Sequence, residues 1–145
     1  MSKFLCLFLI VLLSSCSVYT DDKKSVVYHP TEAVLLGAGV SKVVILKDTK
    51  LLVQVPSNPS TGYRWDLTLP PKFANCFKVL NNGSFIKDRS GTQGIIQIGA
   101  PGLQEWEIQA NCAGVYVLQW NNIRPWEKEQ LPIKTYQIRL EIPPA

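Results

Sequence analysis

The residues that could carry out acid–base or metal chemistry are few in this chain of 145 residues. Its one histidine is His29, and nothing around it resembles the setting of a catalytic nucleophile. Eleven Asp and Glu residues could supply a carboxylate pair, but no two of them stand out by their spacing. The chain also lacks a glycine-rich phosphate loop and a metal-ligand pattern. We therefore expect a binding protein without metal or cofactor, and not an enzyme.

Surface recognition is indicated instead by a short polar segment, Asn58-Pro59-Ser60-Thr61-Gly62-Tyr63. Its proline fixes its own φ and pushes the preceding asparagine toward an extended conformation. The asparagine, serine and threonine side chains can bond to nearby backbone, and the glycine permits a positive φ. This pattern predicts a stiff wedge that loses little entropy on binding. An ordinary turn between two strands is the alternative interpretation.

A second segment of interface type is Arg124-Pro125-Trp126. Arg and Trp are the residue types most enriched at interface hot spots, and the proline restricts the backbone between them. In the alternative interpretation, Trp126 folds back onto the core or stacks on Arg124. The interface interpretation is favoured if the loop that holds Trp126 lies beside the polar wedge.

The elements that position these segments are predicted to be β-strands. Tyr136–Ile142 alternates apolar and polar residues without exception, and no window outside the N-terminal region has a convincing helical period. About seven short strands separated by turn residues predict an all-β, immunoglobulin-like β-sandwich, with a small barrel as the competing fold. The expected strands are Val43–Leu46, Leu51–Val55, Trp65–Leu69, Phe77–Ile86, Leu103–Ala110, Gly114–Trp120 and Ile133–Ile142.

The order of these strands predicts where the connecting loops emerge. Successive antiparallel strands reverse direction, so loops that follow every second strand leave the fold at the same end. Pro56–Arg64, Lys87–Gly102 and Asn121–Pro132 should therefore share one end. The argument fails if Gly94–Ile98 forms a full additional strand.

Three segments, in order, resemble the loop motifs of the chagasin family, which inhibits papain-like cysteine peptidases. We call them the first, second and third loop segments: Asn58-Pro59-Ser60-Thr61-Gly62, Gly99-Ala100-Pro101-Gly102 and Arg124-Pro125-Trp126. The family patterns are roughly Asn-Pro-Thr-Thr-Gly, Gly-x-Gly-Gly and Arg-Pro-Trp. The resemblance covers about Val34 to Ile142, and three motifs at suitable spacing are far more specific than one.

The resemblance implies an immunoglobulin-like sandwich whose three loops enter the active-site cleft of a papain-like peptidase. Binding would be tight, reversible and non-covalent. Thr61 and its neighbours, flanked by Tyr63, would lie closest to the peptidase's catalytic cysteine and histidine. The second loop segment would line one wall through backbone hydrogen bonds, and Arg124 and Trp126 would pack on the other wall.

Two residues depart from the family pattern. Ser60 replaces a threonine and keeps the hydroxyl group, so we expect a mild effect. Pro101 replaces a glycine, which removes a backbone donor and restricts φ. We therefore expect the second loop segment to contribute less, or to contact different peptidases.

The N-terminal region reads as an export signal. Lys3 precedes the apolar run Phe4–Leu13, which is too short to span a bilayer as a helix, since that needs about 20 apolar residues. Leu13-Ser14-Ser15-Cys16 resembles the lipobox of bacterial lipoproteins, in which the signal is cut before a cysteine that is then acylated. A plain secretion signal is the alternative.

These features divide the chain into three parts. We expect residues 1–15 to be the signal, residues 16–31 to hold the lipidated Cys16 and a polar tether, and residues 32–145 to form the inhibitor domain. The protein would be a membrane-anchored lipoprotein facing the periplasm or cell surface, or else secreted.

Two cysteines, Cys76 and Cys112, remain for the exported domain. An oxidising compartment permits a disulfide between them, and two buried free thiols are the alternative. The basic residues are scattered with no run longer than Lys23-Lys24, so we expect no nucleic-acid partner. We expect a monomer. The competing functions are a carbohydrate-binding sandwich, a structural envelope lipoprotein and, least favoured, an enzyme.

Overall fold

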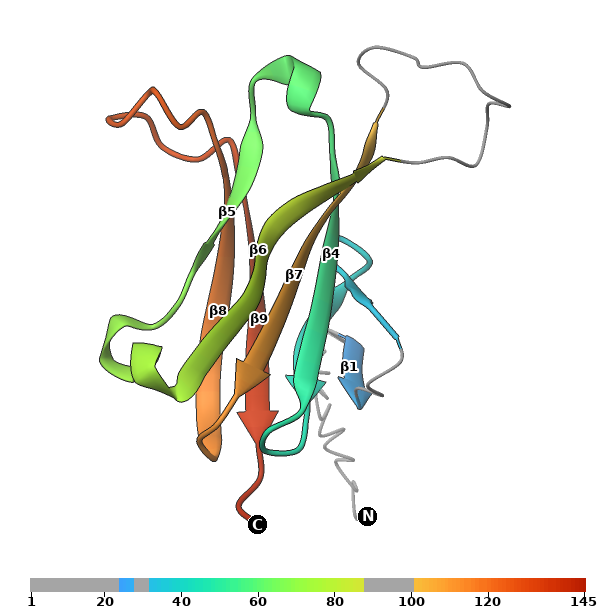
Figure 1. The fold of residues 1–145 in the computed structure, drawn as a ribbon, viewed down its shortest axis with the longest axis vertical. Helices are drawn as coiled ribbons and strands as arrows, with labels where there is room; N and C mark the ends of the chain where they lie inside the picture. The colour runs from blue at the N-terminus through green and yellow to red at the C-terminus, as the bar shows by residue number, and fades with distance from the viewer. Residues whose placement is uncertain (1–23, 28–31, 88–100) are drawn as a thin grey trace, which may run out of the picture.

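The strands of this protein form two sheets that pack face to face (Figure 1). The structure is a computed structural model that describes residues 24–27, 32–87 and 101–145. In the first sheet the strand order is β1 (Lys24–Val27), β3 (Val40–Val44), β9 (Lys134–Ile142), β8 (Gly114–Ile123) and β5 (Arg64–Thr68). In the second the order is β2 (Val34–Leu35), β4 (Lys50–Ser57), β7 (Gly102–Ala110) and β6 (Phe77–Lys87).

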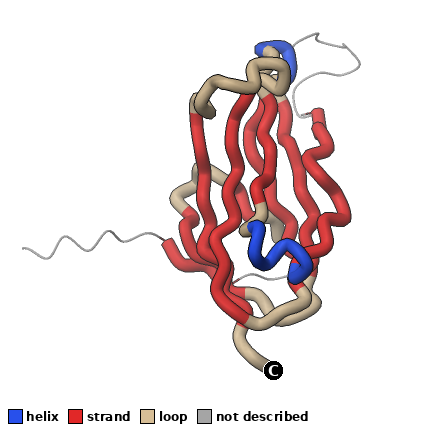
Figure 2. Tube along the Cα trace, turned by 90° about the vertical axis from the view of Figure 1, so that its left-hand side faces the viewer, coloured by secondary structure: helices blue, strands red, loops and turns tan. Residues whose placement is uncertain are grey.

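Two short 3-10 helices lie in the connections between strands: η1 (Pro59–Thr61) joins β4 to β5, and η2 (Pro71–Cys76) joins β5 to β6. Figure 2 shows the two sheets after a quarter turn, with η1 at the upper end and η2 toward the lower end. The predicted all-β, immunoglobulin-like sandwich is confirmed. Within the described ranges, no helix is long and apolar enough to cross a membrane.

The core lies between the sheets and follows the alternation of the sequence. In β7 every second residue is buried, from Gly102 to Ala110, while the residues between them are partly exposed. Across the core, Trp106 of β7 meets Trp120 of β8 edge to face, with ring centroids 6.1 Å apart. Burying a large apolar side chain stabilises the fold by about 1.5–3 kcal/mol. The inward-facing side chains of the two sheets therefore supply most of the free energy that holds the sheets together.

The register of the strands places the connecting loops. Ser57, at the end of β4, pairs with Gly102, at the start of β7, and Lys87, at the end of β6, pairs with the same glycine. Arg64 of β5 pairs with Ile123 of β8. The ends of β4, β6 and β8 therefore lie at one end of the sandwich, which we call the loop end, as the strand order predicted. Gly94–Ile98 lies outside the described residues.

Two strands differ from the sequence prediction at the N-terminal side. β1 pairs in parallel with β3, so the sheet begins at Lys24, inside the segment that the sequence assigned to a tether. β2 has only two residues and pairs in parallel with β4. Strands this short carry too few alternating positions for a sequence signal, because their pairing depends on partners distant in the chain.

The end opposite the loops carries the disulfide Cys76–Cys112, with Cα atoms 5.2 Å apart. It joins the end of η2 to the turn between β7 and β8. Beside it, Tyr116 packs edge to face against both Phe73 and Phe77. The bridge thus holds the far end of the sandwich, away from the loop segments.

Candidate functional site

The first loop segment is a 3-10 turn organised by Asn58. The Oδ1 atom of Asn58 accepts hydrogen bonds from the backbone N–H of Ser60 at 3.2 Å and from the Ser60 hydroxyl at 2.6 Å. The Asn58 carbonyl accepts from the backbone N–H of Thr61 at 3.2 Å and from its hydroxyl at 2.8 Å. Both Ser60 and Thr61 are exposed. The turn therefore presents a preordered, small and polar tip to solvent, as the residue types predicted.

Gly62 ends this turn in the left-handed conformation, with φ of 79°. Its N–H donates to the Pro59 carbonyl at 3.0 Å. A Cβ atom at this position would lie 2.9 Å from Cη2 of Trp126. Glycine is therefore required here for two reasons: the positive φ of the backbone and the close approach of the Trp126 indole ring.

The third loop segment contacts the first loop segment and the flanking residue Tyr63 through two of its side chains. The Arg124 guanidinium lies 4.4 Å from the ring centroid of Tyr63, and its Nη1 atom lies 3.2 Å from Oε1 of Glu127. Trp126 lies against Gly62 and is 66% exposed. Trp126 thus does not fold back onto the core, and Arg124 stacks on Tyr63. The two segments form one continuous surface.

One residue that supports this surface was missed by the sequence analysis. Gln104 of β7 is buried, and its Oε1 accepts from the N–H of Trp65 at 3.0 Å while its Nε2 donates to the Trp65 carbonyl at 2.8 Å. Trp65 Nε1 in turn donates to the Pro56 carbonyl at 3.2 Å. Gln104 thereby links β7 to β5 of the other sheet beneath η1. The available signal was a polar residue at an inward position of the Leu103–Ala110 alternation.

The second loop segment is described only in part. Pro101 is exposed, whereas Gly102 is buried at the start of β7, where a Cβ atom would collide with the Ile86 carbonyl oxygen. Gly102 therefore has a packing role in the structure. Gly99 and Ala100 lie outside the described residues, as do Cys16 and His29.

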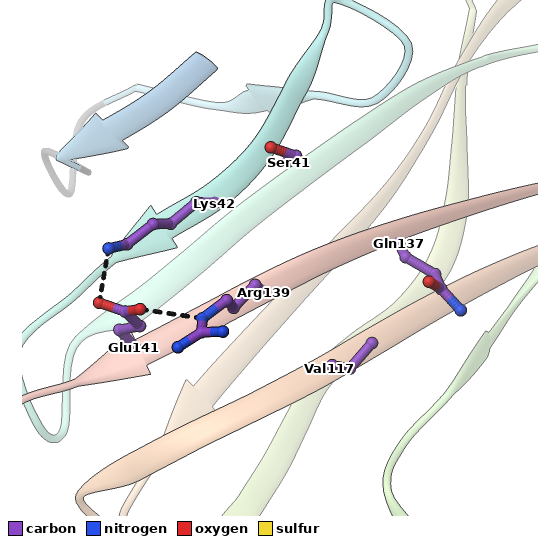
Figure 3. Close-up of a pocket in the computed structure, with 6 residues that line it drawn as sticks. All are labelled: Ser41, Lys42, Val117, Gln137, Arg139 and Glu141. Carbon is purple, nitrogen blue, oxygen red and sulfur yellow. Dashed lines mark hydrogen bonds and ion pairs between the residues drawn. The ribbon is translucent and has the colours of Figure 1, made fainter. Parts of the chain in front are cut away.

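A hollow on the outer face of the first sheet lies away from the loop end, over β3, β8 and β9 (Figure 3). The two carboxylate oxygens of Glu141 lie 2.9 Å from Nζ of Lys42 and 2.9 Å from Nε of Arg139. Both cations that line the hollow are therefore ion-paired with this one carboxylate. The hydrogen bond from Lys42, followed by that from Arg139, lowers the pKa of Glu141. The other lining residues are Ser41, Val117 and Gln137. In the described part of the chain no group of His, Cys, Asp and Glu residues could hold a metal ion.

A family model described as "Chagasin family peptidase inhibitor I42" matches residues 44–140. Among curated proteins, the chain is similar to amoebiasin-2 of Entamoeba histolytica, with 28% identity over 88 residues. That match covers 59% of this chain and 66% of the relative, so the chain spans slightly less than two thirds of amoebiasin-2.

Two solved structures share the fold. The cysteine protease inhibitor EhICP2 of Entamoeba histolytica superposes with a TM-score of 0.56 and 21% identity, over 70% of this chain and 84% of the other. The solution structure of Amebosin gives a TM-score of 0.51 and 18% identity, over 77% of this chain and 98% of the other. At these identities the likeness concerns the β-sandwich itself.

Proposed function

The chain belongs to the chagasin family of peptidase inhibitors, and we propose that it inhibits papain-like cysteine peptidases by inserting its loop end into their active-site cleft. As a member of an inhibitor family it is not an enzyme. The contact between Gly62 and Trp126 carries the proposal, because it joins the first and third loop segments into one exposed surface. The match to amoebiasin-2 and the fold shared with a cysteine protease inhibitor support the same target class.

The geometry of the loop end suits reversible, non-covalent binding. Thr61 stands at the exposed tip, and the bonds to Asn58 hold it in place before any partner arrives. A preordered loop loses little conformational entropy on association, so more of the contact energy appears as affinity. Trp126 supplies an exposed aromatic anchor beside the tip, the residue type most often found at interface hot spots. A surface of about 800 Å² per partner, typical of protease–inhibitor complexes, is within reach of such a loop cluster.

The direct test is titration of the purified protein, starting at Ser17 so that β1 is retained, against papain. We expect stoichiometric inhibition that is reversed by dilution, without cleavage of the inhibitor, while the serine peptidase trypsin stays active. Thr61→Arg and Trp126→Ala should each raise the inhibition constant about tenfold or more, a loss of about 1.4 kcal/mol. Ala113→Arg, at the exposed turn of the opposite end, serves as the matched control. Unchanged inhibition by both loop variants would contradict the proposal.

We also propose that Cys16 carries a lipid anchor, which places the domain at a membrane surface facing the periplasm or cell exterior. The run Leu13-Ser14-Ser15-Cys16 supports this assignment, and the disulfide Cys76–Cys112 suits an oxidising compartment. In bacterial cells fed labelled palmitate, the full chain should be labelled and found in the membrane fraction. Cys16→Ser should lose both properties, and Cys6→Ser should keep them. A Cys16→Ser protein that stays in the membrane fraction would refute the anchor.

A further inference from the structure

The β8–β9 loop, which runs from Arg124 to Ile133, exposes more apolar surface than the third loop segment alone accounts for. Leu131 is 88% exposed and Ile133 is 61% exposed, in addition to Trp126. A single exposed apolar residue is ordinary on a protein surface. Large apolar side chains gathered on one short loop are typical of an interaction site.

This loop is ordered by its own backbone. The N–H of Glu127 donates to the Arg124 carbonyl at 3.0 Å, and the N–H of Gln130 donates to the Glu127 carbonyl at 3.4 Å. At the base, the N–H of Ile133 donates to the Asn122 carbonyl at 3.0 Å. The loop therefore holds two successive turns and is tied to the end of β8.

The conformation of Leu131 follows from its neighbour. Pro132 disfavours the helical region for Leu131, and β9 begins two residues after this proline, at Lys134. The restraints on the backbone around Leu131 reduce the backbone entropy that the loop loses when it binds a partner.

The position of the loop relates these residues to the proposed binding surface. Ile133 lies next to Lys134, which pairs with Asn122 at the loop end of the first sheet. Figure 1 shows the β8–β9 loop at the same end of the sandwich as η1, where β8 ends and where β5 and β9 begin. Leu131 and Ile133 therefore belong to the same loop as Trp126 and lie at the same end of the sandwich as Thr61.

We propose that Leu131 and Ile133 form a second apolar contact with the target peptidase, on surface bordering the cleft, and that they determine which papain-like peptidases bind most tightly. The inference rests on the proposed function and deepens it. The occupant is an apolar patch of the peptidase, because Leu131 and Ile133 share one loop and one end of the sandwich with Trp126 and present two exposed aliphatic side chains. Residues at the rim of a cleft differ more between peptidases than the catalytic groups do, so a rim contact confers selectivity.

The test compares the parent protein with Leu131→Ser and Ile133→Ser against papain, cathepsin L and cathepsin B. Leu46→Ser is the control, since Leu46 is 70% exposed but follows β3 at the opposite end of the sandwich. We expect Leu131→Ser and Ile133→Ser to weaken inhibition of at least one peptidase about tenfold or more, by unequal factors across the three enzymes. The control should inhibit like the parent, and the melting temperatures should agree within error.

The outcomes separate this inference from the proposed function. If the parent inhibits and both loop variants match it against every peptidase, the second contact is overturned and the proposed function stands. If the parent protein inhibits none of the three peptidases, the second contact and the proposed function are both contradicted. Size-exclusion chromatography across a range of concentrations provides the remaining outcome. A dimer of the parent that is lost in Leu131→Ser would assign these side chains to a second copy of the chain and would also overturn the inference.

Discussion

The indole ring of Trp126 lies directly against Gly62, so close that a Cβ atom there would stand 2.9 Å from Cη2. Two loops separated by more than sixty residues in the sequence thus meet at this contact. The contact keeps the large aromatic side chain extended at the surface and beside the polar tip. The binding properties of the two loops should therefore be coupled.

The coupling predicts that Gly62→Ala weakens inhibition by more than its effect on the backbone alone. Alanine at a positive φ costs roughly 1–2 kcal/mol, and here its methyl group would also displace the Trp126 ring. Gly39→Ala is a matched control, since Gly39 has φ of 82° and, among the described residues, no heavy atom within 4 Å of a Cβ placed there. We expect similar backbone strain in both variants, measured by urea denaturation. Only Gly62→Ala should raise the inhibition constant, and equal inhibition by the two would refute the coupling.

Gln104 predicts a second effect on the loop end from inside the core. Gln104→Ala leaves the N–H and carbonyl of Trp65 without their side-chain partners, and each unsatisfied buried group costs about 1–3 kcal/mol. We expect a loss of stability of about 2–6 kcal/mol on this principle, together with weaker inhibition at temperatures where the variant is folded. The control is Gln109→Ala, which removes an exposed bond to the Asp48 carbonyl. Full inhibition by folded Gln104→Ala would show that Gln104 has no role in positioning η1.

The disulfide predicts a separation of stability from binding. The Cys76–Cys112 bridge closes a loop with a sequence separation of 36 residues. By the chain-entropy relation, the double variant Cys76→Ser with Cys112→Ser should lose about 4 kcal/mol of unfolding free energy. Because the bridge lies at the end opposite the loops, the inhibition constant should be unchanged while the domain is folded. Denaturation curves and inhibition assays on the same samples check both parts, and a loss of inhibition by folded protein would contradict the second.

The Glu141 carboxylate predicts a pH dependence on the outer face of the first sheet. Its pKa is lowered by the hydrogen bonds from Lys42 and Arg139, so the unfolded chain binds the proton more tightly than the folded one. The stabilisation is thus present above the unfolded pKa and is lost as the pH falls through the lower folded pKa. Lys42→Met should raise the pKa of Glu141, as measured by NMR titration of its carboxyl carbon. An unaltered titration curve would show that the ion pair does not form in solution.

Much of the fold followed from the sequence because its strands are long and alternate strictly. The alternation in Leu103–Ala110 and Tyr136–Ile142 reflects burial of one face of each strand, which is a local property of the pattern. The stiffness of the first loop segment was predictable for the same reason, since Asn58 bonds to residues two and three positions away. Such interactions depend only on neighbours in the chain.

Other features were decided only by the tertiary structure. β1 and β2 exist because distant strands offer them parallel edges, and Gln104 is tolerated in the core because Trp65 presents both a donor and an acceptor to it. The sequence by itself determined the sandwich, the stiff polar turn and the presence of Arg124 and Trp126 in one loop. Only the packed fold determined that Arg124 stacks on Tyr63 and that Trp126 rests on Gly62, because contacts between residues far apart in the chain depend on where the folded strands bring them.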